Sequence, residues 1–179
     1  MDFITTLKDK DIFPDIAFPP VLEWQTRKTV KVVVQREDGC IALVTNPIHG
    51  CYLLPGGGVE ESEDSLMAAE RECREEISHS ILNPKMFALV EEYRARDGKR
   101  YETHVIMASL GEPTTEDLRT EDEKKNLLSV VWRSLKDAEV LFESQEKMLR
   151  EGKVGFYNTG FNIVRDRLLI QEASKQGLL

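Results

Sequence analysis

The chain has 179 residues, of which 41% are hydrophobic and 31% are charged. These proportions exclude a disordered chain, and the length predicts one globular domain with an ordinary hydrophobic core. The formal net charge of −8 argues against non-specific binding to nucleic acid, which needs a basic surface. It leaves a phosphorylated small molecule as a partner, because a bound metal ion can supply positive charge locally.

The N-terminus and the cysteines predict a cytoplasmic protein without a membrane partner. Met1–Ile4 lacks the charged region and the long apolar run of a signal peptide, and no stretch predicts a membrane span. The number of cysteines is odd and no CxxC pair is present, which indicates reduced thiols in a core. The three cysteines are Cys40, Cys51 and Cys73.

Residues 1–28 are the least informative part of the chain. Their prolines predict turns or extended backbone, because proline restricts the residue before it. We expect residues 1–28 to form an extension packed on or beside the core, followed by a single domain over residues 29–179. Trp24 and Phe18 are interpreted as a hydrophobic plug over that core, with a partner surface as the alternative.

The next segments predict strands and a glycine loop. A β-branched run over residues 30–34 predicts a strand, and Asp38-Gly39 predicts a hairpin turn before a return strand over residues 40–45. A short buried strand over residues 52–54 follows. Gly56-Gly57-Gly58 then lets the backbone approach a ligand closely or adopt positive φ.

An acid-rich helix is predicted from about Asp64 to about Ile77, with Ser62 as its cap. At 3.6 residues per turn, one stripe of this helix is apolar and can face a core. That stripe contains Leu66, Ala69, Cys73 and Ile77.

The neighbouring stripe of the helix carries Glu72, Glu75 and Glu76. Like charges three and four residues apart on a helix repel each other, so a cation among these glutamates would stabilise them. Mg²⁺ and Mn²⁺ are hard ions that prefer oxygen ligands. The spacing therefore indicates a divalent metal site, with a solvated acidic face as the simpler alternative.

The remaining predicted elements are strands followed by two helices, an order that is not a regular βαβ repeat. Ser134 is a candidate cap for the first of two helices near the C-terminus. The predicted order is a strand over 86–96, a turn at Asp97-Gly98, a strand over 100–110, an acidic loop over 111–126, a strand over 127–132, and helices over 135–149 and 161–173.

The stretch from Gly57 to Ser78 resembles the Nudix box. In that pattern a glycine, five residues, Glu, seven residues and Arg-Glu are followed by an apolar residue, any residue, Glu-Glu, any residue, Gly and an apolar residue. Ser78 and His79 depart from its last two positions. The residues that fit in register are Gly57, Glu63, Arg71, Glu72, Cys73, Glu75 and Glu76.

The resemblance to the Nudix family, the MutT-like nucleoside diphosphate-X hydrolases, implies an α/β (α+β) fold. More specifically, it implies an αβα sandwich with a mixed β-sheet, and it makes residues 29–179 the Nudix hydrolase domain. The implied activity is metal-dependent hydrolysis of a pyrophosphate bond in a nucleoside diphosphate-X compound. Such a compound is a nucleoside triphosphate, oxidised or not, or a nucleotide sugar.

The resemblance also implies roles for the residues of the box. Glu72, Glu75 and Glu76 would hold Mg²⁺ or Mn²⁺ with help from the carbonyl of Gly57, and Glu63 would pair with Arg71 as a structural or supporting contact. The general base is left open between box glutamates and acids of the 111–126 loop. The candidates are Glu75 and Glu76 in the box and Glu116, Glu121 and Glu123 in the loop. Among the loop acids, Glu121 is preferred.

Arginines near predicted strand ends are candidates for phosphate contacts, since the guanidinium fork matches phosphate oxygens. They are Arg27, Arg94, Arg96 and Arg100, and a surface charge is the alternative for each.

Two other functions stay open at this point, together with a homodimer as the assembly. One is a catalytically silent Nudix-fold module that binds a nucleotide, although all box acids are present. The other is an isoprenoid diphosphate isomerase, which would need an additional catalytic Cys and Glu pair that the sequence does not identify.

Overall fold

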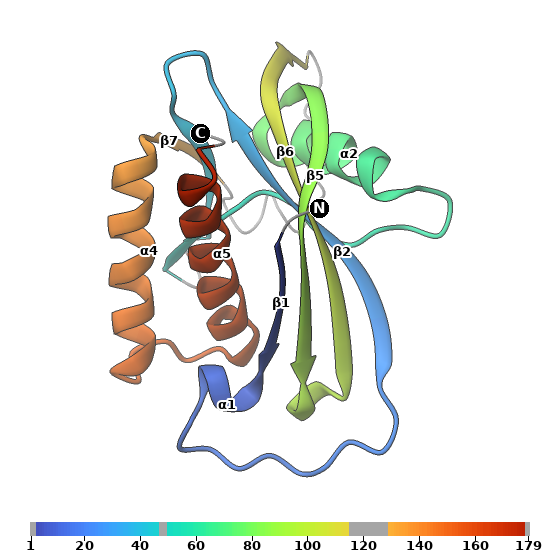
Figure 1. The fold of residues 1–179 in the computed structure, drawn as a ribbon, viewed down its shortest axis with the longest axis vertical. Helices are drawn as coiled ribbons and strands as arrows, with labels where there is room; N and C mark the ends of the chain where they lie inside the picture. The colour runs from blue at the N-terminus through green and yellow to red at the C-terminus, as the bar shows by residue number, and fades with distance from the viewer. Residues whose placement is uncertain (1–2, 47–49, 115–128, 178–179) are drawn as a thin grey trace.

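A computed structural model describes residues 3–46, 50–114 and 129–177. A mixed, seven-stranded sheet forms its middle layer (Figure 1). The strands run in the order β1-β5-β6-β2-β3-β4, and β7 pairs with β3. The pairs β1–β5 and β2–β6 are parallel, and the other pairs are antiparallel. The strands are β1 Phe3–Lys8, β2 Gln25–Gln35, β3 Ile41–Asn46, β4 Cys51–Leu53, β5 His79–Arg94, β6 Lys99–Pro113 and β7 Ser129–Arg133.

Helices cover both faces of this sheet, as Figure 1 shows. Helix α2 (Ser65–Ile77) lies on one face, and α4 (Leu135–Arg150) and α5 (Tyr157–Lys175) lie side by side on the other. The predicted αβα sandwich with a mixed sheet is therefore confirmed. None of the described helices is both long enough and apolar enough to cross a membrane.

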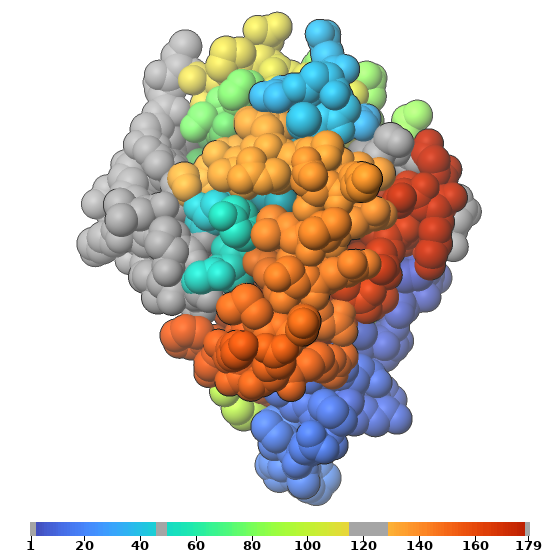
Figure 2. Space-filling model, turned by 90° about the vertical axis from the view of Figure 1, so that its left-hand side faces the viewer, coloured from blue at the N-terminus to red at the C-terminus, as the bar shows by residue number. Residues whose placement is uncertain are grey.

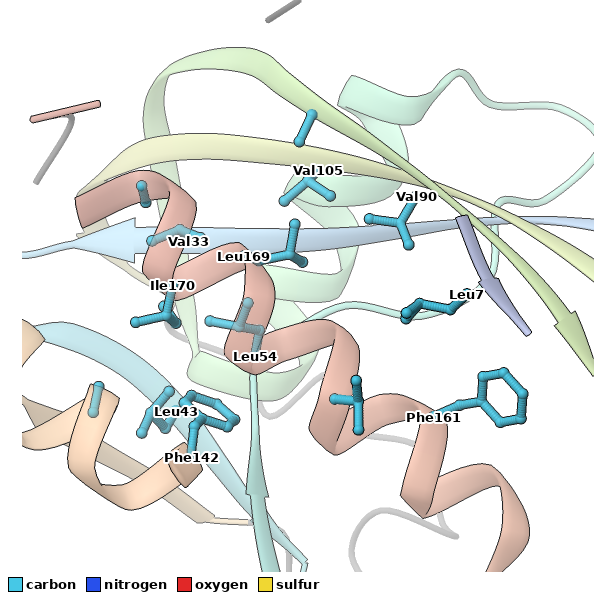
Figure 3. Close-up of a cluster of buried hydrophobic side chains, with 14 of the residues drawn as sticks. Leu7, Val33, Leu43, Leu54, Val90, Val105, Phe142, Phe161, Leu169 and Ile170 are labelled. Carbon is cyan, nitrogen blue, oxygen red and sulfur yellow. The ribbon is translucent and has the colours of Figure 1, made fainter. Parts of the chain in front are cut away.

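The alternation of side chains along β2 divides the core into two clusters. Val30, Val32 and Val34 point to the α2 side, where they meet the buried small residues of that helix. Val33 points to the other side, into a larger cluster beneath α4 and α5 that includes Phe142 and Phe161 (Figure 3). Burying each such aromatic or aliphatic side chain contributes about 1.5–3 kcal/mol, so both faces fix the position of the sheet.

The N-terminal segment is part of the same sheet. Strand β1 pairs with β5, and Leu7 of β1 and Ile12 of α1 (Asp9–Ile12) are buried. The guanidinium of Arg150 donates to the carbonyls of Asp11 and Ile12, which ties α1 to the end of α4. Figure 2 shows the N-terminal segment, in blue, packed against that end of α4.

The two aromatic residues expected to form one plug lie in different places. Phe18 packs near Phe13 and Tyr157, with ring centroids 6.3 and 5.5 Å away. Trp24 instead meets Tyr93 edge to face at 5.2 Å. Each aromatic covers a different part of the sheet and its helices.

The start of α2 differs from the prediction. The helix is capped by Asp64, whose carboxylate accepts hydrogen bonds from the backbone nitrogens of Leu66 and Met67 at 2.8 and 2.9 Å, and not by Ser62. Leu66, expected on the core stripe, is 43% exposed, and Ala68 is buried in its place. The apolar residues buried on α2 are therefore Ala68, Ala69, Cys73 and Ile77.

Strand β2 begins at Gln25, five residues before the predicted run, and β5 and α5 also begin earlier than predicted. Strand β5 starts at His79 and passes through Asn83 and Pro84, where its pairing with β6 shifts register. Asn83 has a φ of 52°, so the turn-like composition there reflects an irregular strand. Helix α5 starts at Tyr157, and its Gly160 is needed because an added Cβ would lie 2.8 Å from the Phe13 ring.

The predicted acidic loop is only partly described. Gly111 to Pro113 belong to β6, and Thr114 follows them, whereas the other loop positions lie outside the described residues. The strand predicted over 127–132 corresponds to β7, Ser129–Arg133.

Ser78 ends α2 in the left-handed region, with φ 57° and ψ 34°. Glycine adopts this conformation without a Cβ penalty, so Ser78→Gly should raise the free energy of unfolding by up to about 1 kcal/mol. Denaturant unfolding in EDTA measures the change. Ser78→Ala is the matched control, because it removes the hydroxyl and keeps the Cβ, and it should give no gain. Equal effects of the two substitutions would contradict the backbone explanation.

Candidate active site

The loop after β4 is held against β2 by backbone hydrogen bonds. The nitrogens of Val32 and Val30 donate to the carbonyls of Pro55 and Gly57 at 2.9 Å, and the nitrogen of Val59 donates to the carbonyl of Lys28 at 3.1 Å. These bonds extend the sheet by one irregular segment. The three glycines are therefore fixed on the sheet, beside the middle of β2.

The buried Lys31 holds the same loop from below. Its Nζ donates to the carbonyls of Leu54 and Gly56, both at 2.7 Å. Burial lowers the pKa of Lys31, and nearby Asp166 acts in the opposite direction. This lysine sits between the loop and the buried carboxylates of the core.

The loop needs glycine at two positions for different reasons. Gly56 has a φ of 127°, and an added Cβ would lie 2.3 Å from the carbonyl oxygen of Val30. At Gly57 an added Cβ would lie 2.5 Å from Oε1 of Glu72. The absence of a side chain at Gly57 is therefore what lets the carboxylate of Glu72 approach the loop.

Two of the three box glutamates, Glu72 and Glu76, present their carboxylates toward this loop, and Glu75 meets Arg71. Glu72 is only 7% exposed, and burial raises its pKa while Arg71 acts to lower it. Oε2 of Glu76 accepts a hydrogen bond from the nitrogen of Gly56 at 2.7 Å. Glu75 lies one turn from Arg71 and accepts from its Nη1 at 3.0 Å. The acidic stripe of α2 thus faces the backbone of the glycine loop.

Arg71 is the cation among these acids. Its Nη1 donates to Oε1 of Glu72 at 2.9 Å and to Glu75, while its Nε and Nη2 donate to the two oxygens of Glu63 at 3.2 and 2.7 Å. Nη2 also donates to the carbonyl of Gly58 at 2.9 Å. The structure therefore contains the Glu63–Arg71 pair expected from the box. The same guanidinium pins the loop to the helix.

Arg71→Met should destabilise the metal-free protein, because it removes a donor that three carboxylates and a carbonyl share. Hydrogen bonds to charged groups contribute about 1.5–3 kcal/mol each when buried, and this site is partly exposed, so we expect a net loss of about 1–3 kcal/mol in the free energy of unfolding. Denaturant unfolding in EDTA measures it.

Arg74→Met is the matched control for Arg71→Met. Arg74 makes an exposed i,i+4 pair with Glu70, and such pairs contribute little. Its substitution should change the free energy of unfolding by at most about 0.5 kcal/mol. Similar losses for the two variants would show that Arg71 is an ordinary surface arginine.

The acids offer the right donors for a divalent ion but do not converge on one point. Among the described residues, no group of three His, Cys, Asp or Glu side chains is placed to hold a metal ion. The reason lies in their partners, since Arg71 draws Glu72 and Glu75 and the Gly56 nitrogen draws Glu76. Carboxylate oxygens suit Mg²⁺ and Mn²⁺, and the half-buried, glycine-lined position suits a small ion. The donor set therefore fits such an ion once these side chains exchange partners.

The carbonyl of Gly57, expected to assist the metal, accepts the hydrogen bond from Val30 at 2.9 Å. A carbonyl oxygen has a second lone pair, so this bond leaves one acceptor position. Glu121, the preferred loop acid, lies outside the described residues, as do Glu116 and Glu123.

A cavity of about 210 Å³ lies on the other side of the glycine loop, against α5. Of the three arginines predicted to bind substrate, only Arg27 lines it, together with Arg94, which was a further candidate. The remaining lining residues are Thr29, Val30, Lys31, Gly56, Gly57, Gly58, Tyr101, Asn158, Asn162 and Arg165.

Arg96 and Arg100 lie away from this cavity. Arg96 follows the end of β5, where its guanidinium stacks over the Tyr157 ring at 4.1 Å. Arg100 is paired with Glu91 and lies on the opposite face of β6 from Tyr101, because side chains alternate along a strand. The structure therefore does not bring these two arginines to the site.

A polar stripe on α5 was missed by the sequence reasoning. Asn158, Asn162 and Arg165 are spaced i, i+4 and i+7, so they share one helix face, and the two asparagines accept hydrogen bonds from Arg94. The spacing of these polar residues is present in the sequence, but only the apolar residues of this helix were used to interpret it. A search for polar as well as apolar periodicity would have found it.

Behind this stripe lies a buried network of charges. Nη2 of Arg94 donates to Oε2 of Glu92 at 2.5 Å, and Nε of Arg165 donates to Oδ1 of Asp166 at 2.8 Å. Oδ2 of Asp166 accepts from the nitrogen of Leu54 at 2.9 Å, next to the glycine loop. The network therefore connects β5, α5 and the end of β4.

Comparisons with known proteins agree with this architecture. A family profile described as the NUDIX domain matches residues 25–154. A NUDIX hydrolase from Nitrosomonas europaea superposes with a TM-score of 0.56 and 18% sequence identity, over 73% of this chain and 91% of that one. The mutator MutT protein from Bacillus halodurans gives a TM-score of 0.53 and 17% identity, over 69% and 80% of the two chains. No protein among the curated sequences matches the chain.

The structural likeness shows the fold, and the profile covers most of the chain, including the glycine loop and the acidic helix. The chain is therefore a member of the NUDIX hydrolase family.

Proposed function

We propose that the chain hydrolyses the pyrophosphate bond of a nucleoside diphosphate-X compound, with Mg²⁺ or Mn²⁺ held by Glu72, Glu75 and Glu76 and by the carbonyl of Gly57. One observation carries this proposal. The acidic stripe of α2 faces a glycine loop so closely that Glu72 leaves no room for a Cβ at Gly57. A solvated acidic face would leave these carboxylates exposed, whereas Glu72 is buried.

A divalent ion bound there would neutralise the phosphate oxygens and lower the pKa of the attacking water. The residues of the chain itself position the carboxylates and the glycine loop. The hydrogen bond from Gly56 to Glu76 fixes this carboxylate against the loop, and Arg71 fixes the loop against α2. Arg27, at the edge of the cavity, is suited to contact a phosphate oxygen.

A carboxylate must also take the proton of the attacking water. We propose Glu75 or Glu76 for this role, because both lie on the half-exposed part of the acidic stripe. Glu121 is the alternative from the 111–126 loop. Single substitutions by Gln, compared by their pH profiles of turnover, would separate the three residues. The base should be the one whose loss removes the acidic limb of the profile.

The cysteines support a cytoplasmic enzyme as part of the proposal. All three are free, and Cys51 and Cys73 are buried. Burial raises the pKa of Cys51 to about 11, so its thiol stays protonated and unreactive at neutral pH. A homodimer is an additional prediction, and sedimentation equilibrium would check it.

A panel of nucleoside triphosphates and nucleotide sugars tests the proposed function. The release of phosphate, pyrophosphate or nucleoside monophosphate is measured with Mg²⁺, with Mn²⁺ and in EDTA. We expect hydrolysis of at least one compound with metal and none in EDTA. Metal-independent hydrolysis would contradict the role of the acids. Hydrolysis of nothing, with a nucleotide raising the melting temperature, would make the protein a binding module.

A further inference from the structure

The acid site and the cavity lie on the two sides of the same three glycines. Glu72 touches the place where a Cβ of Gly57 would be, and Nη2 of Arg27 lies 3.0 Å from the place where a Cβ of Gly58 would be. Gly56, Gly57 and Gly58 all line the cavity. A diphosphate lying over this loop would therefore place one of its two substituents in the cavity.

The cavity is strongly cationic although the chain as a whole is acidic. Arg27, Lys31, Arg94 and Arg165 line it, and no carboxylate does so among the described residues. The formal net charge of the chain is −8, so a cavity lined by four basic residues differs in charge from the chain as a whole. Glu92 and Asp166 lie behind the lining, are fully buried and pair with Arg94 and Arg165. Burial lowers the pKa of Lys31, but the three lining arginines still outnumber these two carboxylates.

The side chains from α5 present donors to the cavity. Oδ1 of Asn158 accepts from Nη1 of Arg94 at 2.9 Å, and Oδ1 of Asn162 accepts from Arg94 and Arg165 at 3.1 and 3.2 Å. Both amide oxygens accept hydrogen bonds from arginines, so the amide nitrogens are the groups left to donate to a ligand. The asparagines thus add donors to a cavity that already has cations.

Two of the buried arginine nitrogens have no acceptor. Nη2 of Arg165 and Nε of Arg94 are buried without a hydrogen-bond partner among the described residues, and the two arginines are only 3% exposed. Unsatisfied buried donors are uncommon in native proteins and call for an explanation. Both nitrogens are closed off from the cavity as the side chains lie, so an acceptor oxygen of a ligand would reach them only after the arginine side chains turn.

We infer that the cavity receives an anionic group, a phosphate ester or a carboxylate, carried by one substituent of the diphosphate. This inference rests on the proposed function, because the diphosphate places the substituent. A neutral nucleobase has donors as well as acceptors on its edge, and it brings no negative charge to meet the lining arginines. A phosphate or carboxylate offers acceptors only and matches the fork of an arginine.

The size of the cavity agrees with a compact group. Its volume of about 210 Å³ is below the range of about 300–1,000 Å³ that holds a drug-sized ligand. The anionic group and the sugar or short chain next to it would fill it. An additional base would have to lie outside.

Two matched pairs of ligands test the inference by calorimetry in EDTA, where no hydrolysis occurs. NADP⁺ and NAD⁺ differ by one phosphate ester, and UDP-glucuronate and UDP-glucose differ by one carboxylate. In at least one pair, we expect the member with the additional phosphate ester or carboxylate (the anionic member) to bind at least about tenfold more tightly. The reason is that hydrogen bonds between charged groups are stronger than those between neutral groups. The pair that shows the preference identifies the kind of anion. Equal affinities within both pairs, or no binding by any of the four, would overturn the inference.

Asn158→Asp locates the preference in the cavity. The new carboxylate keeps its bond with Arg94 and brings a negative charge to the lining. This charge repels the anionic group, so the two members of the pair should then bind with about equal affinity. Asn83→Asp is the matched control, because Asn83 is exposed on β5 and does not line this cavity. If the melting temperature shows that Asn158→Asp does not fold, Arg27→Gln at the exposed edge takes its place. A preference that survives substitution in the cavity overturns the inference.

Turnover with Mg²⁺ on the same four compounds separates this inference from the proposed function. Hydrolysis without a preference for the anionic member keeps the function and overturns the inference. Tighter binding of the anionic member in EDTA without hydrolysis of any compound supports the anion site and contradicts the hydrolase.

Discussion

Glu76→Gln should lower turnover on the best substrate by a factor on the order of 10² or more, because one preorganised negative charge is lost from the metal site. Gln has nearly the same shape, and its amide oxygen can accept the bond that Glu76 now accepts from the nitrogen of Gly56. The fold should therefore be kept. In EDTA the melting temperature should be unchanged or slightly higher, because repulsion between the glutamates of α2 is reduced.

The matched control for this experiment is Glu143→Gln. Glu143 is exposed on α4, far in sequence from the box, and the substitution makes the same change in charge on a helix. It should leave turnover at the wild-type level. Wild-type turnover in Glu76→Gln would show that the acidic stripe does not hold the catalytic ion.

Gly57→Ala should have the second largest effect on turnover, because its new Cβ would crowd the carboxylate of Glu72. The new Cβ would lie 2.5 Å from Oε1 and 2.9 Å from Cδ of Glu72, so the carboxylate must move. Gly57 does not have positive φ, and the crowded atoms are at the end of a flexible side chain, so the protein should still fold. Displacing a catalytic group by about 1 Å lowers turnover by a factor of up to about 10².

Gly155→Ala is the control for Gly57→Ala. An added Cβ at Gly155 meets no atom within 4 Å, and the backbone there has no positive φ. Turnover and the affinity for Mn²⁺ should both fall in Gly57→Ala and stay unchanged in Gly155→Ala. A Gly57→Ala protein with normal Mn²⁺ affinity would show that Glu72 does not hold the ion in its present place.

The acid site could be predicted from the sequence because its parts are close together along the chain. Helical spacing places Glu72, Glu75 and Glu76 on one stripe, and the glycines precede that helix by only a few residues. Local geometry therefore determines most of the site. What the spacing could not give is the present partner of each acid, since the position of Arg71 among them depends on rotamers.

The cavity could not be predicted in the same way because its residues come from distant parts of the chain. Arg27 and Arg94 belong to strands that do not pair with each other, and Asn158 and Arg165 lie on the last helix. Only the packing of α5 on the sheet brings them together. Arg96 and Arg100 were equally good candidates by sequence, and strand alternation and the end of β5 place them elsewhere.

The family match covers the whole acid site but only part of the cavity. The profile covers residues 25–154, which includes the glycine loop and α2 but leaves out β1 and α5. The matched region thus carries the acids and also Arg27 and Arg94 of the cavity, whereas α5 carries the asparagines and Arg165.

The most direct test of the account is a crystal of the wild-type protein soaked with Mn²⁺ and examined by anomalous diffraction. We predict a peak between the glycine loop and α2, with oxygens of Glu72, Glu75 or Glu76 within about 2.0–2.6 Å of the ion, the range of hard divalent cations. Arg71 should then have released Glu72 or Glu75. A peak at another place, with none beside these glutamates even when a nucleotide is bound, would contradict the account.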